Sequence, residues 1–175
     1  MQNDILEVIK SRRSTRKFRD GRLDSEKLQR VLKAGLLAPS SGNKRPVEFI
    51  VVQDRETIGK LKECKKFGTS GLDTAPCAIV VIADSELSDV WPEDASIATI
   101  LLQLEAESLD LGTVWIQIRN RQSDTGNSED EVRAVLNIPE KYGVLDILAI
   151  GYKDERKNPY GEEDLDFSPV HKERF

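Results

Sequence analysis

Apolar residues recur along the chain at spacings that distinguish helices from strands. One set has helical spacing and lies between a cap at Asp24 or Ser25 and a helix-ending proline, Pro39: Leu28, Val31, Leu32, Gly35 and Leu36. Residues 94–109 are apolar on almost every side, which predicts a helix buried in the core or in an oligomer interface. Four shorter, nearly continuous apolar runs predict buried strands: 48–53, 77–83, 113–118 and 144–152.

The remaining pattern adds helices before, between and after these strands. An apolar stripe at residues 5–9 follows the helix-start signal Asp4-x-x-Glu7 and runs into a group of arginines. Residues 55–65 predict a short helix, and Ser128-x-x-Glu131 predicts a capping box at the start of another. Gly112 is expected to end the helix at 94–109. Because two helices precede the first strand, the order favours a mixed sheet flanked by helices over a doubly wound fold.

Length and charge narrow the class of protein. With 175 residues, the chain is predicted to be a single domain, 1–175. Residues 153–175 are polar with isolated aromatic residues and no core pattern, so we expect them to pack on another surface. The net charge of −5 disfavours nucleic acid or an anionic membrane as the main partner. No apolar run approaches the ~18 residues of a membrane span, and no signal-peptide core is present, which favours the cytoplasm.

The chain lacks several familiar catalytic and cofactor motifs. Cys64 and Cys77 form no Cys-x-x-Cys pair and His171 is the only histidine, so neither a zinc site nor a Ser-His-Asp triad is predicted. No Gly-x-Gly-x-x-Gly follows a strand and no Gly-x-x-x-x-Gly-Lys-Ser/Thr occurs. These absences exclude the Rossmann fingerprint and the P-loop.

Two polar segments near the N-terminus carry the candidate chemistry. Residues 11–16 contain three guanidinium groups and several hydroxyls, and a guanidinium fork matches two phosphate oxygens at once. Residues 38–46 form a turn rich in small hydrogen-bonding side chains, which suit the polar edge of a heteroaromatic ring. Each segment alone also has a simpler interpretation: a solvated, basic helix end for the first, and an ordinary loop for the second.

Taken in order, the motifs resemble those of the nitroreductase family over essentially the whole chain. The first two motifs are Arg12-x-Ser14-x-Arg16 and the run Ala38-Pro39-Ser40-Ser41-Gly42-Asn43. The later ones are Ala75-Pro76, Leu111-Gly112-Thr113, residues 115–121 and Ile150-Gly151-Tyr152. The resemblance implies an α+β fold with a mixed, mostly antiparallel sheet, an intertwined homodimer, and a C-terminal arm at 153–175 that packs on the partner subunit.

The resemblance also implies an FMN site. Arg12 would bind the phosphate, Arg13 and Ser14 the phosphate and ribityl chain, and Arg16 the pyrimidine edge. The neighbouring subunit would contribute Pro39, Ser40, Ser41 and Asn43. A backbone N–H of Gln117, or of a neighbour within 115–119, would approach flavin N5. The chain departs from the family where Val47 replaces a tryptophan. It also lacks a basic pair within residues 157–163, since Lys172 and Arg174 lie later.

The implied activity is that of an FMN-dependent oxidoreductase. Hydride from NADH or NADPH would reach flavin N5 and pass to a small organic acceptor of the nitroaromatic, quinone or flavin type, in ping-pong order. No catalytic side chain and no metal are expected, because the flavin carries the redox chemistry. Three alternatives stay open: a specialised relative such as a dehalogenase, a flavin-binding sensor or carrier without turnover, and an anion- or nucleic-acid-binding module using residues 11–19. The acidic net charge weighs against the last of these.

Overall fold

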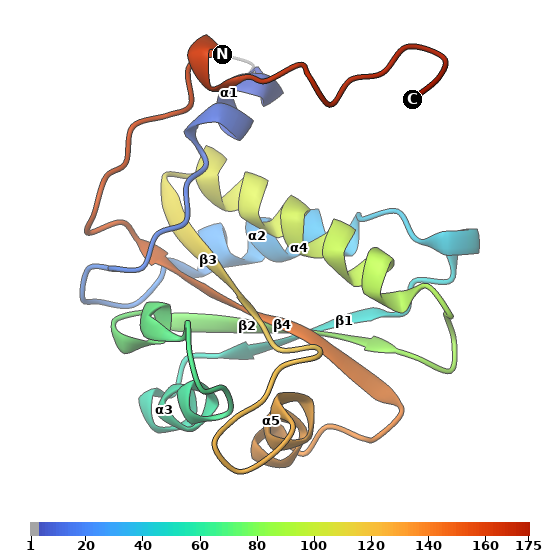
Figure 1. Ribbon diagram of the computed structural model, residues 1–175. Helices are drawn as coiled ribbons and strands as arrows, with labels where there is room; N and C mark the ends of the chain where they lie inside the picture. Colours follow the sequence, from blue (N-terminus) through green and yellow to red (C-terminus); the bar gives the residue numbers. More distant parts are fainter. Residues whose placement is uncertain (1–3) are drawn as a thin grey trace.

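A four-stranded antiparallel sheet forms the centre of the molecule (Figure 1). The computed structural model describes residues 4–175, so the first three residues of the predicted domain 1–175 lie outside it. The strands are β1 (Val47–Val52), β2 (Cys77–Asp84), β3 (Leu111–Gln117) and β4 (Tyr142–Tyr152), in the order β1-β2-β4-β3. Every neighbouring pair is antiparallel, and a parallel one-residue bridge joins Ser14 to Thr113. The predicted α+β fold with a mostly antiparallel sheet is confirmed.

Helices cover both faces of this sheet. The helices are α1 (Ile5–Ser11), α2 (Ser25–Leu36), α3 (Arg55–Glu63), α4 (Trp91–Ser108) and α5 (Ser128–Leu136). Three short 3₁₀ turns are η1 (Ser41–Asn43), η2 (Ser70–Asp73) and η3 (Glu162–Asp164). α2 and α4 pack on one face, and α3 and α5 pack on the other (Figure 1). Because β2 and β4 are central and covered on both faces, their sequences are continuous apolar runs.

Several predicted element boundaries are wrong. α4 begins at Trp91, three residues before the predicted start, with Pro92 in its first turn. It ends at Ser108, so Gly112 does not end the helix and lies within β3 instead. Leu36, which we placed on the core face of α2, is 63% exposed.

The capping box predicted at Ser128 does not form. The α5 cap is Asn127, whose side chain accepts a hydrogen bond from the N–H of Glu129. The Glu131 carboxylate accepts hydrogen bonds from the Ser123 and Thr125 hydroxyls instead of returning to the helix start. The spacing was compatible with a capping box, but a neighbouring turn offered the glutamate better donors.

One side of α4 buries small and branched apolar residues against the sheet, while its other side stays partly open. Ala95, Ala98 and Leu102 are fully buried, whereas Ile97 and Ile100 are 38% and 39% exposed. On the neighbouring helix α1, Val8 is buried but the rest of the apolar stripe is exposed. The predicted interface helix therefore has an uncovered apolar side in the single chain. No helix within residues 4–175 is long and apolar enough to cross a membrane.

The predicted C-terminal arm divides into two parts. Residues 153–160 lie beside the N-terminal part of their own chain, where the N–H groups of Asp154 and Tyr160 donate to the carbonyls of Lys17 and Lys10. Residues 161–175 pass α1 and continue beyond it as an extended segment (Figure 1). Phe167 and Phe175 in this segment are largely exposed. Packing on a partner subunit therefore remains a prediction for residues 161–175.

Candidate functional site

The N-terminal segment, residues 12–18, lies against the ends of β3 and β4. The N–H of Thr15 donates to the Thr113 carbonyl at 2.9 Å, and Phe18 forms an antiparallel bridge with Lys153. Thr15 and Phe18 are buried, with 4% and 3% of their surfaces exposed. These two anchors fix the backbone, so the intervening polar and basic side chains are presented at the surface.

Two glycines make room for this segment. Gly112 of β3 and Gly151 of β4 face each other in the sheet register. A Cβ added at Gly112 would lie 2.7 Å from the Thr15 side chain, and one at Gly151 would lie 2.6 Å from Pro76 and 3.0 Å from Phe18. A larger residue at Gly112 would push Thr15 and the N-terminal segment away from the sheet, whereas one at Gly151 would collide first with Pro76.

The predicted phosphate-binding residues differ in how far they are already engaged. Arg12 and Arg16 make no side-chain hydrogen bond or ion pair with any other residue within 4–175. The Arg13 guanidinium instead donates to the Asn158 carbonyl and lies 4.3 Å from the Tyr160 ring centre. The Ser14 carbonyl accepts a hydrogen bond from Lys157 Nζ at 2.6 Å. Within the described chain, two guanidinium groups are thus available to meet an anion, and Arg13 is bound to the tail.

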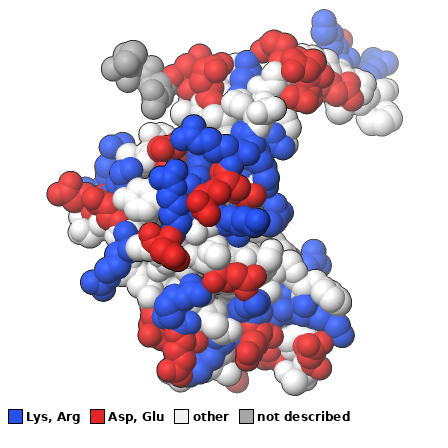
Figure 2. Space-filling view, turned by 90° about the vertical axis from the view of Figure 1, so that its left-hand side faces the viewer, with Lys and Arg blue, Asp and Glu red and all other residues white. Residues whose placement is uncertain are grey.

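A cavity of about 370 Å³ lies beside the N-terminal segment. Its lining combines Ser11, Arg13 and Thr15 with Lys153, Arg156 and Lys157 from the start of the tail. Lys and Arg side chains gather in the middle of the corresponding face (Figure 2). Acids in the lining are partly engaged: Glu107 pairs with Lys153 at 2.7 Å, and the N–H of Arg16 donates to Glu155, which lowers the pKa of that carboxyl. Asp110 is a third acid in the lining, so the four cationic side chains leave it only slightly basic, although the whole chain is acidic.

The second predicted segment, the loop at residues 39–43, lies at the other end of α4. The N–H of Ser41 donates to Asp94 in the first turn of α4, whereas the N-terminal segment contacts β3 and β4 near Glu107 in its last turn. Asp94 and Glu107 are roughly 20 Å apart along the helix axis at 1.5 Å per residue. Figure 1 shows the two segments on opposite sides of the molecule. One chain therefore does not bring its own two segments together.

Gln117 is the last residue of β3, which is an edge strand. Its side chain is internally satisfied, since it accepts from Trp115 Nε1 and donates to the Arg119 carbonyl. Within the described chain, the backbone of β3, unlike the Gln117 side chain, has free groups. The Thr113 carbonyl accepts from Thr15 on the side away from β4, and the backbone N–H and C=O groups of successive residues point to alternate sides of a strand. The N–H groups of Trp115 and Gln117 consequently face the open edge, where they can meet a ligand.

The comparisons with known proteins agree with this architecture. The family model described as "Nitroreductase family" matches residues 9–66 and 61–152. The chain belongs to the nitroreductase family. A protein of Archaeoglobus fulgidus, provisionally named NADH dehydrogenase/NAD(P)H nitroreductase, is 38% identical over 98% of this chain and 99% of its own length.

Two further relatives extend the comparison. The structure of an FMN-dependent nitroreductase from Clostridium difficile has a TM-score of 0.94 and 48% identity, covering 97% of this chain and 99% of its own. An FMN reductase [NAD(P)H] of Bacillus subtilis is 30% identical over 88% of this chain and 68% of its own length. The predicted family is therefore confirmed.

The sequence analysis missed two basic residues of this nitroreductase-family chain. Residues 157–163 hold no basic pair, but Arg156 and Lys157, which begin four residues after Tyr152, line the cavity beside Arg13. The signal was present in the sequence one residue earlier than we looked. Lys172 and Arg174 lie in the exposed part of the tail that extends beyond α1 (Figure 1).

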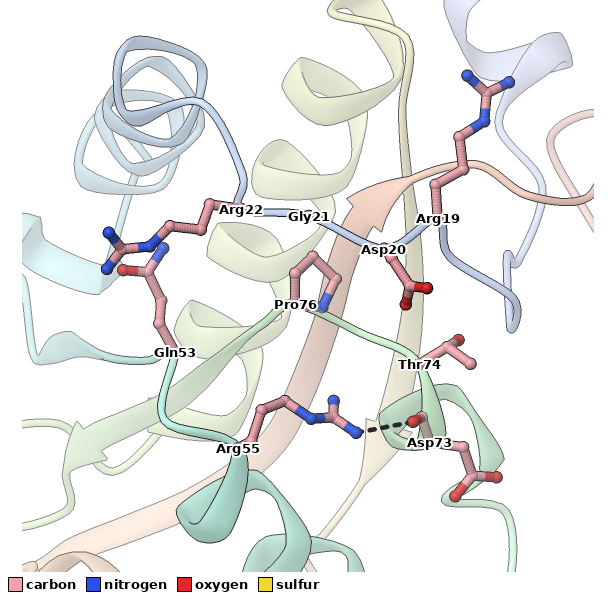
Figure 3. Close-up of a pocket in the computed structure, with 9 residues that line it drawn as sticks. All are labelled: Arg19, Asp20, Gly21, Arg22, Gln53, Arg55, Asp73, Thr74 and Pro76. Atoms are coloured by element: carbon pink, nitrogen blue, oxygen red, sulfur yellow. Dashed lines mark hydrogen bonds between the residues drawn. The ribbon is translucent and has the colours of Figure 1, made fainter.

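A second cavity, of about 330 Å³, lies at the opposite edge of the N-terminal region and is lined by three arginines (Figure 3). Arg55 is fully engaged there, because it donates to the carbonyls of Ala75 and Asp73. Figure 3 shows Arg19 pointing away from Arg55, while the Asp20 carboxylate lies near Thr74. The charges in this cavity do not converge on one point, so it is a poorer candidate for a phosphate site than the cavity beside Arg13. Residues 4–175 contain no cluster of His, Cys, Asp or Glu that would hold a metal ion.

Proposed function

We propose that this protein binds FMN and uses hydride from NADH or NADPH to reduce a small organic acceptor of the nitroaromatic, quinone or flavin type, in ping-pong order. The predicted enzyme class and cofactor are confirmed at the level of the family by the names of its relatives, which include an FMN-dependent nitroreductase and an FMN reductase. The acceptor type and the kinetic order are our proposal.

The residues present fit an FMN molecule. The guanidinium groups of Arg12 and Arg16 suit a phosphate and an electron-rich ring edge, and neither must break a bond to another described residue to bind. Lys157 donates to the carbonyl of Ser14, between the two arginines in the sequence, and lines with Arg156 the cavity beside Arg13; Arg12 and Arg16 do not line that cavity. Across the proposed interface, Ser40, Ser41 and Asn43 offer hydroxyl and amide groups. The outward N–H of Gln117 offers a donor on the edge of β3.

Each group would have a simple task. Bound FMN would supply the redox chemistry, accepting hydride from the nicotinamide and delivering it to the acceptor. Arg12 would hold the phosphate, and Arg16 would place a fixed positive charge where negative charge develops on reduction. The loop at 39–43 would orient the ring and limit the access of water to it. None of these tasks needs a side chain that exchanges protons.

The separation of the two segments is the observation that carries the dimer proposal. They lie at opposite ends of α4, and the side of α4 between them exposes Ile97 and Ile100. A two-fold axis through this apolar side would place the N-terminal segment of one subunit beside the loop of the other. We therefore propose a homodimer with two equivalent sites, each built from both subunits.

The purified protein is expected to be yellow, to release FMN rather than FAD on denaturation, and to be bleached by NADH or NADPH without oxygen. Arg12→Ala should lower FMN affinity by about tenfold or more, since a charge-assisted hydrogen bond contributes roughly 1.5–3 kcal/mol. The matched control is Arg22→Ala, which removes the same charge from an exposed residue of the other cavity (Figure 3).

Flavin titration of the apoproteins measures the FMN affinities of wild type, Arg12→Ala and Arg22→Ala. If Arg12→Ala and Arg22→Ala weaken FMN binding equally, Arg12 contributes only to the general electrostatic attraction and does not bind the phosphate. A colourless protein with no affinity for FMN would refute the proposed function. A yellow protein that reduced nicotinamide does not bleach would favour a flavin-binding sensor or carrier.

A further inference from the structure

Asp94 is a buried acid that links three parts of the chain. It lies in the first turn of α4 and is only 3% exposed. Its Oδ1 accepts from the N–H of Ser41 at 2.8 Å, and its Oδ2 accepts from the hydroxyl of Ser88 at 3.0 Å. Two hydrogen bonds and the positive end of the helix dipole compensate the carboxylate for its burial. Sequence analysis gave no role to this residue, which it placed only as the first residue of an apolar helix.

The loop that Asp94 holds has few other attachments. Residues 41–45 are all exposed, and Gly42, Asn43 and Arg45 adopt positive φ angles of 57°, 54° and 52°. Two of these three are not glycine, so the local backbone conformation is costly by itself. The side-chain bonds within the loop join its own members, such as Ser40 Oγ with the N–H of Arg45. They shape the turn. Outside the loop, Lys44 pairs with Asp89 at 3.8 Å, but both side chains are exposed and such a pair contributes little.

We infer that Asp94 is a positioning residue for FMN: it fixes the loop at residues 39–43 in the place from which the loop meets the flavin of the partner subunit. The inference rests on the proposed function. Asp94 touches no part of the flavin under this proposal and acts through the backbone of Ser41. If the loop were mobile in the free protein, flavin binding would have to order it, and the loss of conformational entropy would weaken the affinity. The hydrogen bond from Ser41 to Asp94 orders the loop before the flavin binds.

The other end of α4 has a comparable arrangement. Glu107, in the last turn, pairs at 2.7 Å with Lys153, which forms the bridge to Phe18 of the N-terminal segment. The Glu107 side chain is 8% exposed. Helix α4 thus carries an acid at each end. Asp94 contacts one of the two predicted half-sites, the loop at residues 39–43, and Glu107 is linked through Lys153 to the other, the N-terminal segment at residues 12–18. The same helix thereby fixes the distance between the two half-sites of a chain.

Three variants separate loop positioning from general stability. Asp94→Ala removes both acceptors. Asp94→Asn keeps an oxygen for the N–H of Ser41 and presents an amide donor to the Ser88 hydroxyl. Ser88→Ala removes the hydroxyl of the fully buried Ser88, the other partner of Asp94, but leaves the hydrogen bond from Ser41 intact. We expect the FMN affinity of the apoprotein to fall about tenfold or more in Asp94→Ala and to be largely restored in Asp94→Asn. Ser88→Ala should lose stability to urea with little change in FMN affinity.

Hydrogen exchange of the apoproteins gives a second measurement that needs no flavin. The amides of residues 41–45 should exchange faster in Asp94→Ala than in wild type, with no comparable change in Ser88→Ala. If Asp94→Ala does not fold, Ser41→Pro removes the donor N–H instead and should bind FMN more weakly than its matched control, Ser41→Ala.

The outcomes distinguish this inference from the proposed function. Wild-type affinity for FMN together with unchanged affinity in Asp94→Ala would overturn the inference and leave the function intact. Faster loop exchange without a loss of affinity would also overturn it, because the tether would then be structural only. Equal losses of FMN affinity in Asp94→Ala and Ser88→Ala would do the same. A wild-type protein with no affinity for FMN would overturn the function and the inference together.

Discussion

Asp146 is a fully buried acid in the interior of this protein. It lies between α4 and the sheet, where one carboxyl oxygen accepts from the Thr99 hydroxyl at 2.8 Å and the other has no partner among the described residues. Burial raises the pKa of Asp146 well above its ordinary value, and the bond from Thr99 offsets only part of that effect. The folded protein therefore favours the neutral acid. In the sheet register Asp146 is paired with Gln117, so this group lies beside the open end of β3.

This arrangement predicts a specific pH dependence. In the unfolded chain Asp146 ionises near its usual pKa of about 3.9, whereas the folded state resists ionisation. Rising pH therefore stabilises the unfolded state, and the contribution of Asp146 to stability is lost from about pH 4 up to its folded-state pKa. The amide introduced by Asp146→Asn does not titrate. The free energy of unfolding of wild type minus that of Asp146→Asn should fall as pH rises above about 4. A difference that does not vary with pH would show that Asp146 is not held neutral by burial.

Single residues were predictable where a motif identified them. The positions of Arg12, Arg16 and Asn43 followed from the motifs of residues 11–16 and 38–46, although their roles in binding remain predictions. Asp94 was not predictable, because its importance depends on a loop fifty residues earlier folding back onto the start of α4. Nor does the sequence reveal that Arg13 is engaged, since its partners Asn158 and Tyr160 come from the other end of the chain.

At the scale of elements, the contact between β3 and the N-terminal segment depends on Gly112. Gly112→Ala would place a methyl group 2.7 Å from the buried side chain of Thr15. We expect a loss of about 1–3 kcal/mol in the free energy of unfolding, typical of overpacking. FMN affinity should also fall, because displacing Thr15 moves the adjacent Arg12 to Arg16 cluster. Urea denaturation and flavin titration measure the two effects.

Gly59→Ala provides the control for this prediction. Gly59 lies inside α3, and a Cβ there would meet nothing within 4 Å. Alanine should therefore raise stability by up to about 1 kcal/mol through its better helix propensity. If Gly112→Ala is as stable as wild type and binds FMN equally well, the N-terminal segment is not positioned by its contact with Gly112.

Elements were predictable where hydrophobic periodicity decides them. All four strands and the main helices occur within a few residues of the expected bounds, because burial on one or both faces imposes the pattern. Gly112 was misplaced because glycine is common at helix ends and the sequence does not show that Thr15 needs the space. The Ser128 box failed for a related reason: Glu131 had competing donors in the preceding turn.

At the scale of the whole molecule, the sequence orders the two predicted half-sites but does not place them. They are about twenty-five residues apart in the chain, yet α4 separates them in the fold. Mutations can distinguish a site shared between subunits from one within a chain. Arg12→Ala removes the proposed phosphate ligand. Asn43→Gly removes the amide while keeping a residue that accepts the φ of 54°. Each homodimeric variant should bind FMN weakly.

Purified heterodimers with differently tagged subunits then give opposite results in the two cases. If sites span the interface, combining an Arg12→Ala subunit with an Asn43→Gly subunit restores one intact site, since the good Arg12 and the good Asn43 come from different chains. Combining wild type with the double variant restores none, because each site then contains one defect. If each site lies within one chain, the second heterodimer has the intact site and the first has none. The number of tightly bound FMN molecules per heterodimer therefore distinguishes a shared site from a site within one chain. Tight binding only in the heterodimer of wild type with the double variant would refute the shared site.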